Sequence, residues 1–117
     1  FPVIIHCVAA FQELIAVKQK LNISVPLVIH GFSKSTALAH QLLDHGFYIS
    51  FGKYLIKNPD LKEVFEKVPD NRFFLETDTI EEGIEQVYAL AAAYKKIDVV
   101  SLQQIVTRNL NTVFKNG

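Results

Sequence analysis

The chain has 117 residues with 12 basic and 12 acidic side chains, so its formal net charge is zero, which excludes a protein that binds polyanions through its overall charge. Half of the residues are hydrophobic and 21% are charged, a composition typical of a folded domain, which excludes a disordered tail or linker. The length suits one domain with its own core and is too short for two ordinary domains.

The first half of the chain alternates short apolar runs with amphipathic segments. Residues 2–7 (PVIIHC) predict a buried strand, and apolar residues recur at helical spacing over residues 11–21. A second apolar run, over residues 26–31, precedes a helix that Ser33 can cap and that ends at Gly46, a glycine of the kind that follows helix ends. These patterns predict two successive strand–helix units.

The alternation continues in the second half of the chain. A third strand is expected over residues 47–52. Asn58 and Pro59 then open a helix as its N-terminal cap and first-turn proline. A fourth strand is expected over residues 72–78.

Two helices close the chain, at about residues 84–97 and 101–114. Ser101 and Gln104 have the spacing of a capping box at the start of the second helix. Its apolar residues, which are expected to be buried, are Leu102, Ile105, Val106, Leu110 and Val113.

The order β-α-β-α-β-α-β-α-α with continuously apolar strands predicts one α/β unit with a parallel sheet covered on both faces. The chain has no G-x-G-x-x-G or Walker loop, so nucleotide-binding versions of this architecture lack support.

Three of the predicted strands end in a side chain that can bind a metal ion, namely His6, His30 and Asp78. His30 follows His6 by 24 residues and precedes Asp78 by 48, which corresponds to one and two strand–helix units. We therefore expect the three side chains at one level of the sheet, its carboxyl edge, where parallel α/β proteins form their sites. Two imidazoles and a carboxylate suit Zn, Mn, Ni or Fe, and carboxylates also suit Mg.

Each of these residues also has a plainer interpretation. A histidine at a strand end is more often a hydrogen-bonded structural residue than a ligand, and three ligands are fewer than a two-metal site needs. Glu76 points to the same face of its strand as Asp78, where it would orient a ligand or form a salt bridge. Lys34 and Lys53 lie on loops after strands, where they could meet a phosphate, but solvated loop lysines explain them as well.

The strand ends and the last helix carry recognisable motifs. They are His6 within PVIIHC, V-I-H-G-F-S at residues 28–33, Y-I-S-F-G at residues 48–52, L-E-T-D at residues 75–78, and Arg108-Asn109 followed by Phe114. In this collinear order, over essentially the whole chain, the motifs resemble the TatD family of metal-dependent deoxyribonucleases.

The resemblance implies a (β/α)8 TIM barrel of the amidohydrolase-like kind, of which residues 1–117 would form the C-terminal half, strands five to eight with their helices. It also implies two divalent metal ions, Mg, Mn or Zn, with His6, His30 and Asp78 among their ligands. Asp78 would in addition accept a proton from the attacking water, and Glu76 would be a further active-site carboxylate. The other ligands would come from a missing N-terminal half, so we expect this fragment alone to be inactive.

The activity that the resemblance implies is the hydrolysis of DNA phosphodiester bonds, by exonucleolytic trimming of single strands, with Lys34 and Lys53 as substrate contacts. Two alternatives stay open. One is an amidohydrolase-type enzyme that acts on another ester or amide, because a fold does not fix a reaction. The other is a degenerate barrel without catalysis, since residues 7–10 (CVAA) replace a polar run of the family and Thr79 replaces its proline.

Some expectations concern the whole protein. A strand that begins at residue 1, without an initiator Met or a signal peptide, predicts a fragment of a longer protein. Half a barrel would have two unpaired edges and an open apolar interior, so we expect it to pair with a second half or to aggregate. The single cysteine is typical of a reducing, cytoplasmic location. No apolar run reaches the roughly 18 residues of a membrane span, so we expect no membrane partner.

Overall fold

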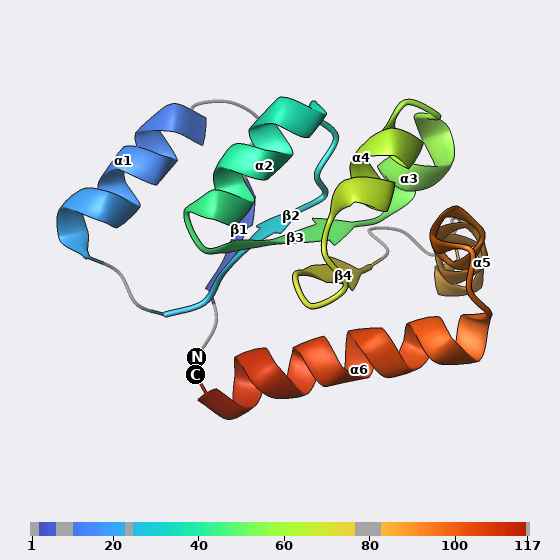
Figure 1. The fold of residues 1–117 in the computed structure, drawn as a ribbon. Coiled ribbons are helices and arrows are strands. Elements are labelled where there is room, and N and C mark those ends of the chain that lie inside the picture. The colour runs from blue at the N-terminus through green and yellow to red at the C-terminus, as the bar shows by residue number, and fades with distance from the viewer. Residues whose placement is uncertain (1–2, 7–10, 23–24, 77–82, 117) are drawn as a thin grey trace.

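Four parallel strands form the centre of the structure (Figure 1). This computed structural model describes residues 3–6, 11–22, 25–76 and 83–116, with the backbone alone at residues 3, 6, 53, 115 and 116. The strands, which lie side by side in chain order, are β1 (Val3–His6), β2 (Leu27–His30), β3 (Phe47–Phe51) and β4 (Phe73–Leu75). Every neighbouring pair is parallel, as the alternating sequence predicts, so the four carboxyl ends share one edge of the sheet.

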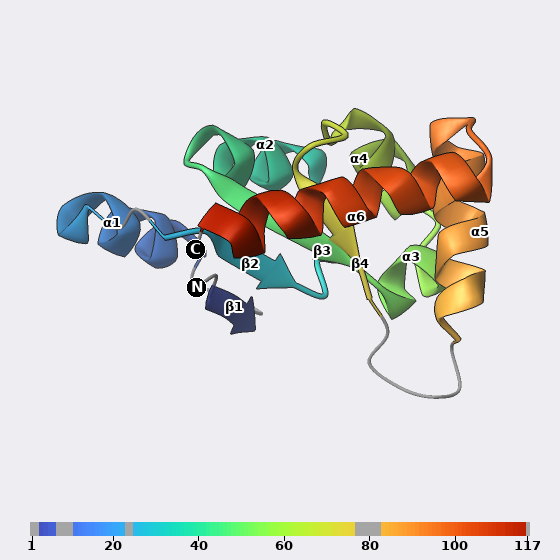
Figure 2. The ribbon, with the colours of Figure 1, turned by 90° about the horizontal axis from the view of Figure 1, so that it is seen from below.

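Six helices are formed by the described residues. They are α1 (Phe11–Leu21), α2 (Thr36–Asp44), α3 (Lys53–Lys57), α4 (Leu61–Lys67), α5 (Ile84–Lys95) and α6 (Val99–Asn116). Helix α3 is not evident in the sequence, because five residues are too few to show a helical period. Figures 1 and 2 show α1, α2 and α4 on one face of the sheet, while α6 crosses the other face. No helix in the described ranges combines the length and the apolar content that a bilayer crossing requires.

The main core lies between the sheet and the helices of the first face. Alternate strand residues point into it, because side chains change face at every step along a strand. The fully buried strand residues of this core are Ile29, Phe47, Ile49, Phe51 and Phe73. The apolar face of α4 and the residue after this helix add four buried side chains to the core, Leu61, Val64, Phe65 and Val68. The rings of Phe51, Phe65 and Phe73 pack edge to face, with centroids 5.0 Å apart at each step.

The other face of the sheet is covered unevenly. Val28 and Phe74 pack there against Val113 of α6 in a small second cluster. Beside this cluster runs a groove of about 200 Å³, where Ile4 and Leu110 remain 51% and 41% exposed. Helices therefore lie on both faces of the sheet, as predicted, but among the described residues α6 covers the second face only in part. The expected burial of Leu110 is wrong, because this residue lines the groove and is left partly uncovered by the described residues.

Two predicted helix caps lie at different residues. Ser35, and not Ser33, caps α2, since its Oγ accepts a hydrogen bond from the N–H of Leu38 at 3.2 Å. Before α6, Oδ1 of Asp98 accepts from the N–H of Ser101 at 2.6 Å, so Asp98 takes the capping role expected of Ser101. The same bond is the main reason that the pKa of Asp98 lies below its ordinary value.

The segment between α3 and α4 also differs in detail from the prediction. Asn58 ends α3, and its Oδ1 accepts from the N–H of Asp60 at 3.2 Å. Helix α4 itself begins at Leu61, so Asn58 and Pro59 form the turn before the helix and not its cap and first position. The end of α2 is as expected, because Gly46 follows it with a left-handed φ of +85°.

Asn109 attaches α6 to the amino end of β4. Its side chain is 2% exposed, and Nδ2 donates to the backbone oxygens of Asp70 and Phe73, each at 2.8 Å. These bonds fix α6 at the edge of the sheet opposite to the strand carboxyl ends.

Candidate functional site

The carboxyl edge of the sheet gathers the predicted site residues from separate strands. His6 and His30 are register partners at the ends of β1 and β2, as their spacing predicts. Glu76 follows β4 directly, and its backbone N–H donates to the oxygen of Phe51 at 2.9 Å. The side chain of His6 and the whole of Asp78 lie outside the described residues.

The carboxylate of Glu76 accepts hydrogen bonds from two neighbouring strand ends. The N–H of Gly31 donates to Oε1 at 2.7 Å, and Oγ of Ser50 donates to Oε2 at 2.7 Å. Nδ1 of His30 lies 2.5 Å from the same Oε2. The side chains of His30 and Glu76 are only 20% and 17% exposed, so these charge-assisted bonds are little weakened by water. Glu76 therefore holds the His30 ring at the end of its strand.

Two glycines make room for this arrangement. Gly31 has a left-handed φ of +63°, which turns the chain after β2 so that its N–H reaches Glu76. Gly52 follows β3, where a Cβ atom would come within 2.9 Å of Cγ of Glu76. The close approach of the two strand ends therefore requires a residue without a side chain at Gly52.

The chemistry of His30 fits a metal ligand. When Nδ1 donates to a carboxylate, the imidazole ligates through Nε2, and this pairing is the usual one for metal-bound histidine. Within the described part of the chain, no three His, Cys, Asp or Glu side chains are grouped so that they could hold a metal ion. The predicted ligand set of His6, His30 and Asp78 extends beyond that part, and it stays a prediction.

Charged and aromatic residues lie beside this edge. Lys34 is exposed in the turn after β2, and Tyr54 is 37% exposed in α3, directly after β3. Lys53 is the first residue of α3, but its side chain lies outside the part of the chain that the structure describes. Phe32 is instead 2% exposed and packs edge-on against Phe51 at 6.1 Å, so it belongs to the core. The predicted substrate contacts Lys34 and Lys53 thus both follow strand ends at this edge.

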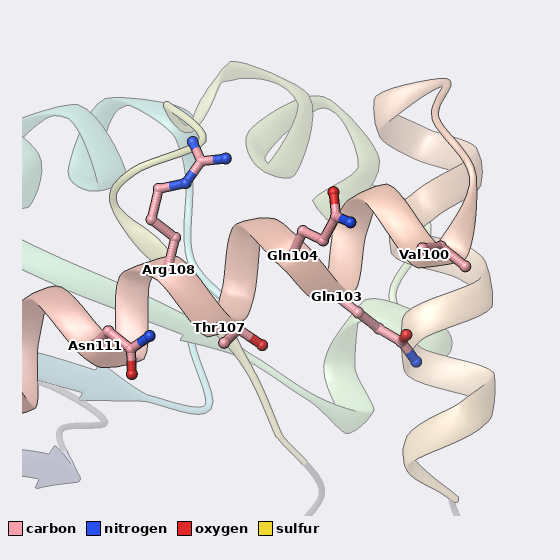
Figure 3. Close-up of a pocket in the computed structure, with 6 residues that line it drawn as sticks. All are labelled: Val100, Gln103, Gln104, Thr107, Arg108 and Asn111. Carbon is pink, nitrogen blue, oxygen red and sulfur yellow. The ribbon is translucent and has the colours of Figure 1, made fainter.

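Another hollow of the surface lacks such chemistry. It runs along α6 and is lined by Val100, Gln103, Gln104, Thr107, Arg108 and Asn111. Figure 3 shows that Arg108 and Gln104 point to one side of the helix, away from Gln103 and Thr107. Among the described residues, no imidazole or carboxylate lines it, and α6 is attached at the amino end of β4. The described lining of this hollow therefore offers neither a base nor a metal ligand.

The remaining two histidines of the chain lie on or beside α2. His40 is exposed on α2. His45 ends the same helix, with Nδ1 3.0 Å from the backbone oxygen of Gln41. Neither belongs to the carboxyl edge.

Three site residues were not predicted from the sequence, namely Gly31, Ser50 and Gly52. Their contribution depends on contacts with Glu76, which is 45 residues from Gly31 and 26 from Ser50 along the chain. The available signal was one serine among the aromatic and aliphatic residues of the strand Phe47–Phe51 and a glycine directly after each of two strands.

Relatives of the chain are named metal-dependent hydrolases. The family model described as TatD related DNase matches residues 1–115. The chain is 33% identical to an uncharacterised metal-dependent hydrolase of Buchnera aphidicola and 30% identical to one of Escherichia coli K12. Each alignment covers 97% of this chain and 49% of the relative, so the chain spans about half the length of the curated relatives it matches.

Solved structures share the fold. A TatD homologue of Escherichia coli superposes with a TM-score of 0.86 at 22% identity, over 97% of this chain and 49% of that one. A TatD family hydrolase of Entamoeba histolytica gives 0.85 at 16% identity, over 97% and 50%. These neighbours are TIM-barrel proteins matched over about half of their chains, which confirms the predicted α/β half-barrel architecture. With nearly all of its residues matched by the family model, the chain belongs to the TatD-related DNase family.

Proposed function

We propose that the protein is a metal-dependent hydrolase that removes nucleotides from the ends of single-stranded DNA. The observation that carries the proposal is the bond between Nδ1 of His30 and Glu76 at the carboxyl edge of a TatD-family sheet. A histidine held in this way presents its other ring nitrogen to a metal ion. Relatives aligned over nearly the whole chain are named metal-dependent hydrolases, which supports the same chemistry.

In this proposal His6, His30 and Asp78 hold divalent ions, two in number and Mg, Mn or Zn in kind. When bound, such ions supply Lewis acidity toward the phosphate and make water a nucleophile at neutral pH. Glu76 keeps the His30 ring in place through its 2.5 Å contact. Asp78 accepts the proton that the attacking water gives up.

The substrate would be held by residues at the rim of the same edge. Lys34 and Lys53 bind backbone phosphates, and the exposed ring of Tyr54 offers a stacking surface for a base. This arrangement needs only a local basic rim, which is compatible with a net charge of zero. We assign this activity to the cytoplasm, the reducing compartment that the single cysteine favours.

We further propose that the chain forms strands five to eight of a TIM barrel. The exposure of Ile4 and Leu110 on the side of the sheet that holds the groove supports this, since an inward barrel face is buried in the complete fold. The remaining barrel units would cover that face and contribute further metal ligands.

Cleavage of end-labelled single-stranded DNA by the full-length protein tests the proposal. Progressive shortening should occur with Mg²⁺ or Mn²⁺, stop with a chelator, and fall by at least about a hundredfold in Asp78→Asn, since removal of a catalytic group commonly costs this much. No cleavage by the folded, metal-loaded wild type would refute the DNase assignment. Cleavage of a small ester or amide in its place would then indicate an amidohydrolase-type enzyme.

A further inference from the structure

Ser50, near the carboxyl end of β3, donates a hydrogen bond to the Glu76 carboxylate that contacts His30. We propose that Ser50 is a positioning residue for His30. Together with the N–H of Gly31, its hydroxyl holds the Glu76 carboxylate so that Oε2 accepts from Nδ1 of His30, which fixes the imidazole in the tautomer that ligates through Nε2. The inference rests on the proposed function only where it takes the ligand of Nε2 to be a metal ion.

The directions of the three hydrogen bonds determine where the ring proton lies. The N–H of Gly31 can only donate, and it occupies Oε1 at 2.7 Å. The hydroxyl of Ser50 donates to Oε2 at 2.7 Å. A carboxylate that receives these donors is an acceptor, so Nδ1 of His30, 2.5 Å from Oε2, must carry a proton. The lone pair of the neutral ring then lies on Nε2.

The position of Ser50 supports a specific role for its hydroxyl. The residue is 3% exposed in an apolar strand, where an unbonded hydroxyl would be unfavourable. Its side chain faces the same side of the sheet as Glu76, beside the groove that Val28 and Phe74 line. Its backbone oxygen accepts from the N–H of Phe32 at 3.1 Å, which fastens the turn after β2 to β3. Ser50 therefore contacts both the carboxylate and the turn that directly follows His30.

Glu76→Gln tests the direction of the bond to His30. The N–H of Gly31 still requires an oxygen, so the amide oxygen takes the place of Oε1 and the NH₂ group takes the place of Oε2. Because an NH₂ group only donates, Nδ1 of His30 must accept, and the ring proton moves to Nε2. We expect the tautomer to invert and Mn²⁺ affinity to fall by about 10–100-fold, as for other changes to the partner of a ligating histidine.

Ser50→Ala removes one of the two groups that orient Glu76. The carboxylate keeps its bond to Gly31 but can rotate away from His30, so we expect the ring to sample both tautomers and Mn²⁺ affinity to fall by about tenfold. Ser35→Ala is the matched control. Its hydroxyl caps α2, so its loss destabilises the protein without contact to Glu76, and the wild-type tautomer should persist.

Long-range ¹H–¹⁵N NMR spectra of the histidine rings measure the tautomer in the full-length protein without metal, at a pH where the rings are neutral. The signal of His30 is assigned by its absence in His30→Gln. We expect a single Nδ1–H ring in the wild type and Ser35→Ala, a mixture in Ser50→Ala, and an Nε2–H ring in Glu76→Gln.

An Nε2–H ring in the wild type, or an unchanged ring in either Ser50→Ala or Glu76→Gln, would overturn the inference. The spectra need neither metal nor DNA. The expected tautomers in a protein without nuclease activity would therefore contradict only the proposed function. Nuclease activity with unexpected tautomers would contradict only the role of Ser50.

Discussion

Gly52 lies so close to Glu76 that a side chain at this position must displace the carboxylate. A Cβ atom there would be 2.9 Å from Cγ of Glu76 and 3.0 Å from its backbone oxygen. Neither atom is the end of a flexible side chain, so neither can swing aside. We therefore expect Gly52→Ala to push β3 and the residue after β4 apart.

The size of the effect follows from these distances. Ordinary contact begins at 3.4 Å, so Cβ and Cγ must separate by about 0.5 Å. Overpacking of this kind lowers the free energy of unfolding by about 1–3 kcal/mol. The same shift lengthens the 2.7 Å bond from Ser50 to Glu76 to about 3.2 Å, beyond the usual range for two oxygens. The hold on His30 weakens as a result, and metal affinity should fall by about tenfold or more.

Urea unfolding and calorimetric titration with Mn²⁺ measure the two effects of Gly52→Ala separately. Gly46→Ala is the control, because Gly46 has a left-handed φ of +85° but lies at the amino end of β3. It should lose about 1–2 kcal/mol through backbone strain and bind metal as the wild type does. Gly52→Ala with unchanged stability and unchanged affinity would refute the steric argument.

Three further predictions concern α6 and the substrate rim. Asn109→Ala should lower the free energy of unfolding in urea by about 1–3 kcal/mol, because it leaves two backbone oxygens unbonded, whereas exposed Asn111→Ala should change it by less than about 0.5 kcal/mol. The lowered pKa of Asp98 stabilises the fold at neutral pH and ceases to do so as the pH falls through that pKa. The loss of stability between pH 7 and 3 should therefore be smaller in Asp98→Asn, and an equal loss would contradict this. Lys34→Ala should reduce the slope of log affinity for single-stranded DNA against log salt by about 0.7, while Lys20→Ala on α1 should not.

Much of the fold could be predicted because the strands are short, apolar and regularly separated by helices. The sequence did not correctly predict which residues of α6 are buried. The helical spacing of Leu110 predicts an inward position, but the residue is 41% exposed because α6 alone covers that side of the sheet in the described residues. The predicted cap Ser33 was wrong because Ser35, two residues later, is an equally good capping residue, and only the backbone conformation distinguishes the two.

The site could be predicted only where spacing along the chain carries the information. His30 ends one strand and Glu76 directly follows another, so a parallel sheet brings them to one edge. The contributions of Ser50 and Gly52 depend instead on contacts between neighbouring strands, which set how closely the strand ends approach. The order of residues along the chain does not determine those distances between neighbouring strands.

Calorimetric titration of the full-length protein with Mn²⁺ and Zn²⁺ tests most directly whether the carboxyl edge is the metal site. His30→Gln should lower the affinity by at least about tenfold. His40→Gln, which changes an exposed histidine on α2, should bind metal as the wild type does. Equal affinities in the two variants, or no metal binding by the folded wild type, would contradict the assignment of this edge as the metal site.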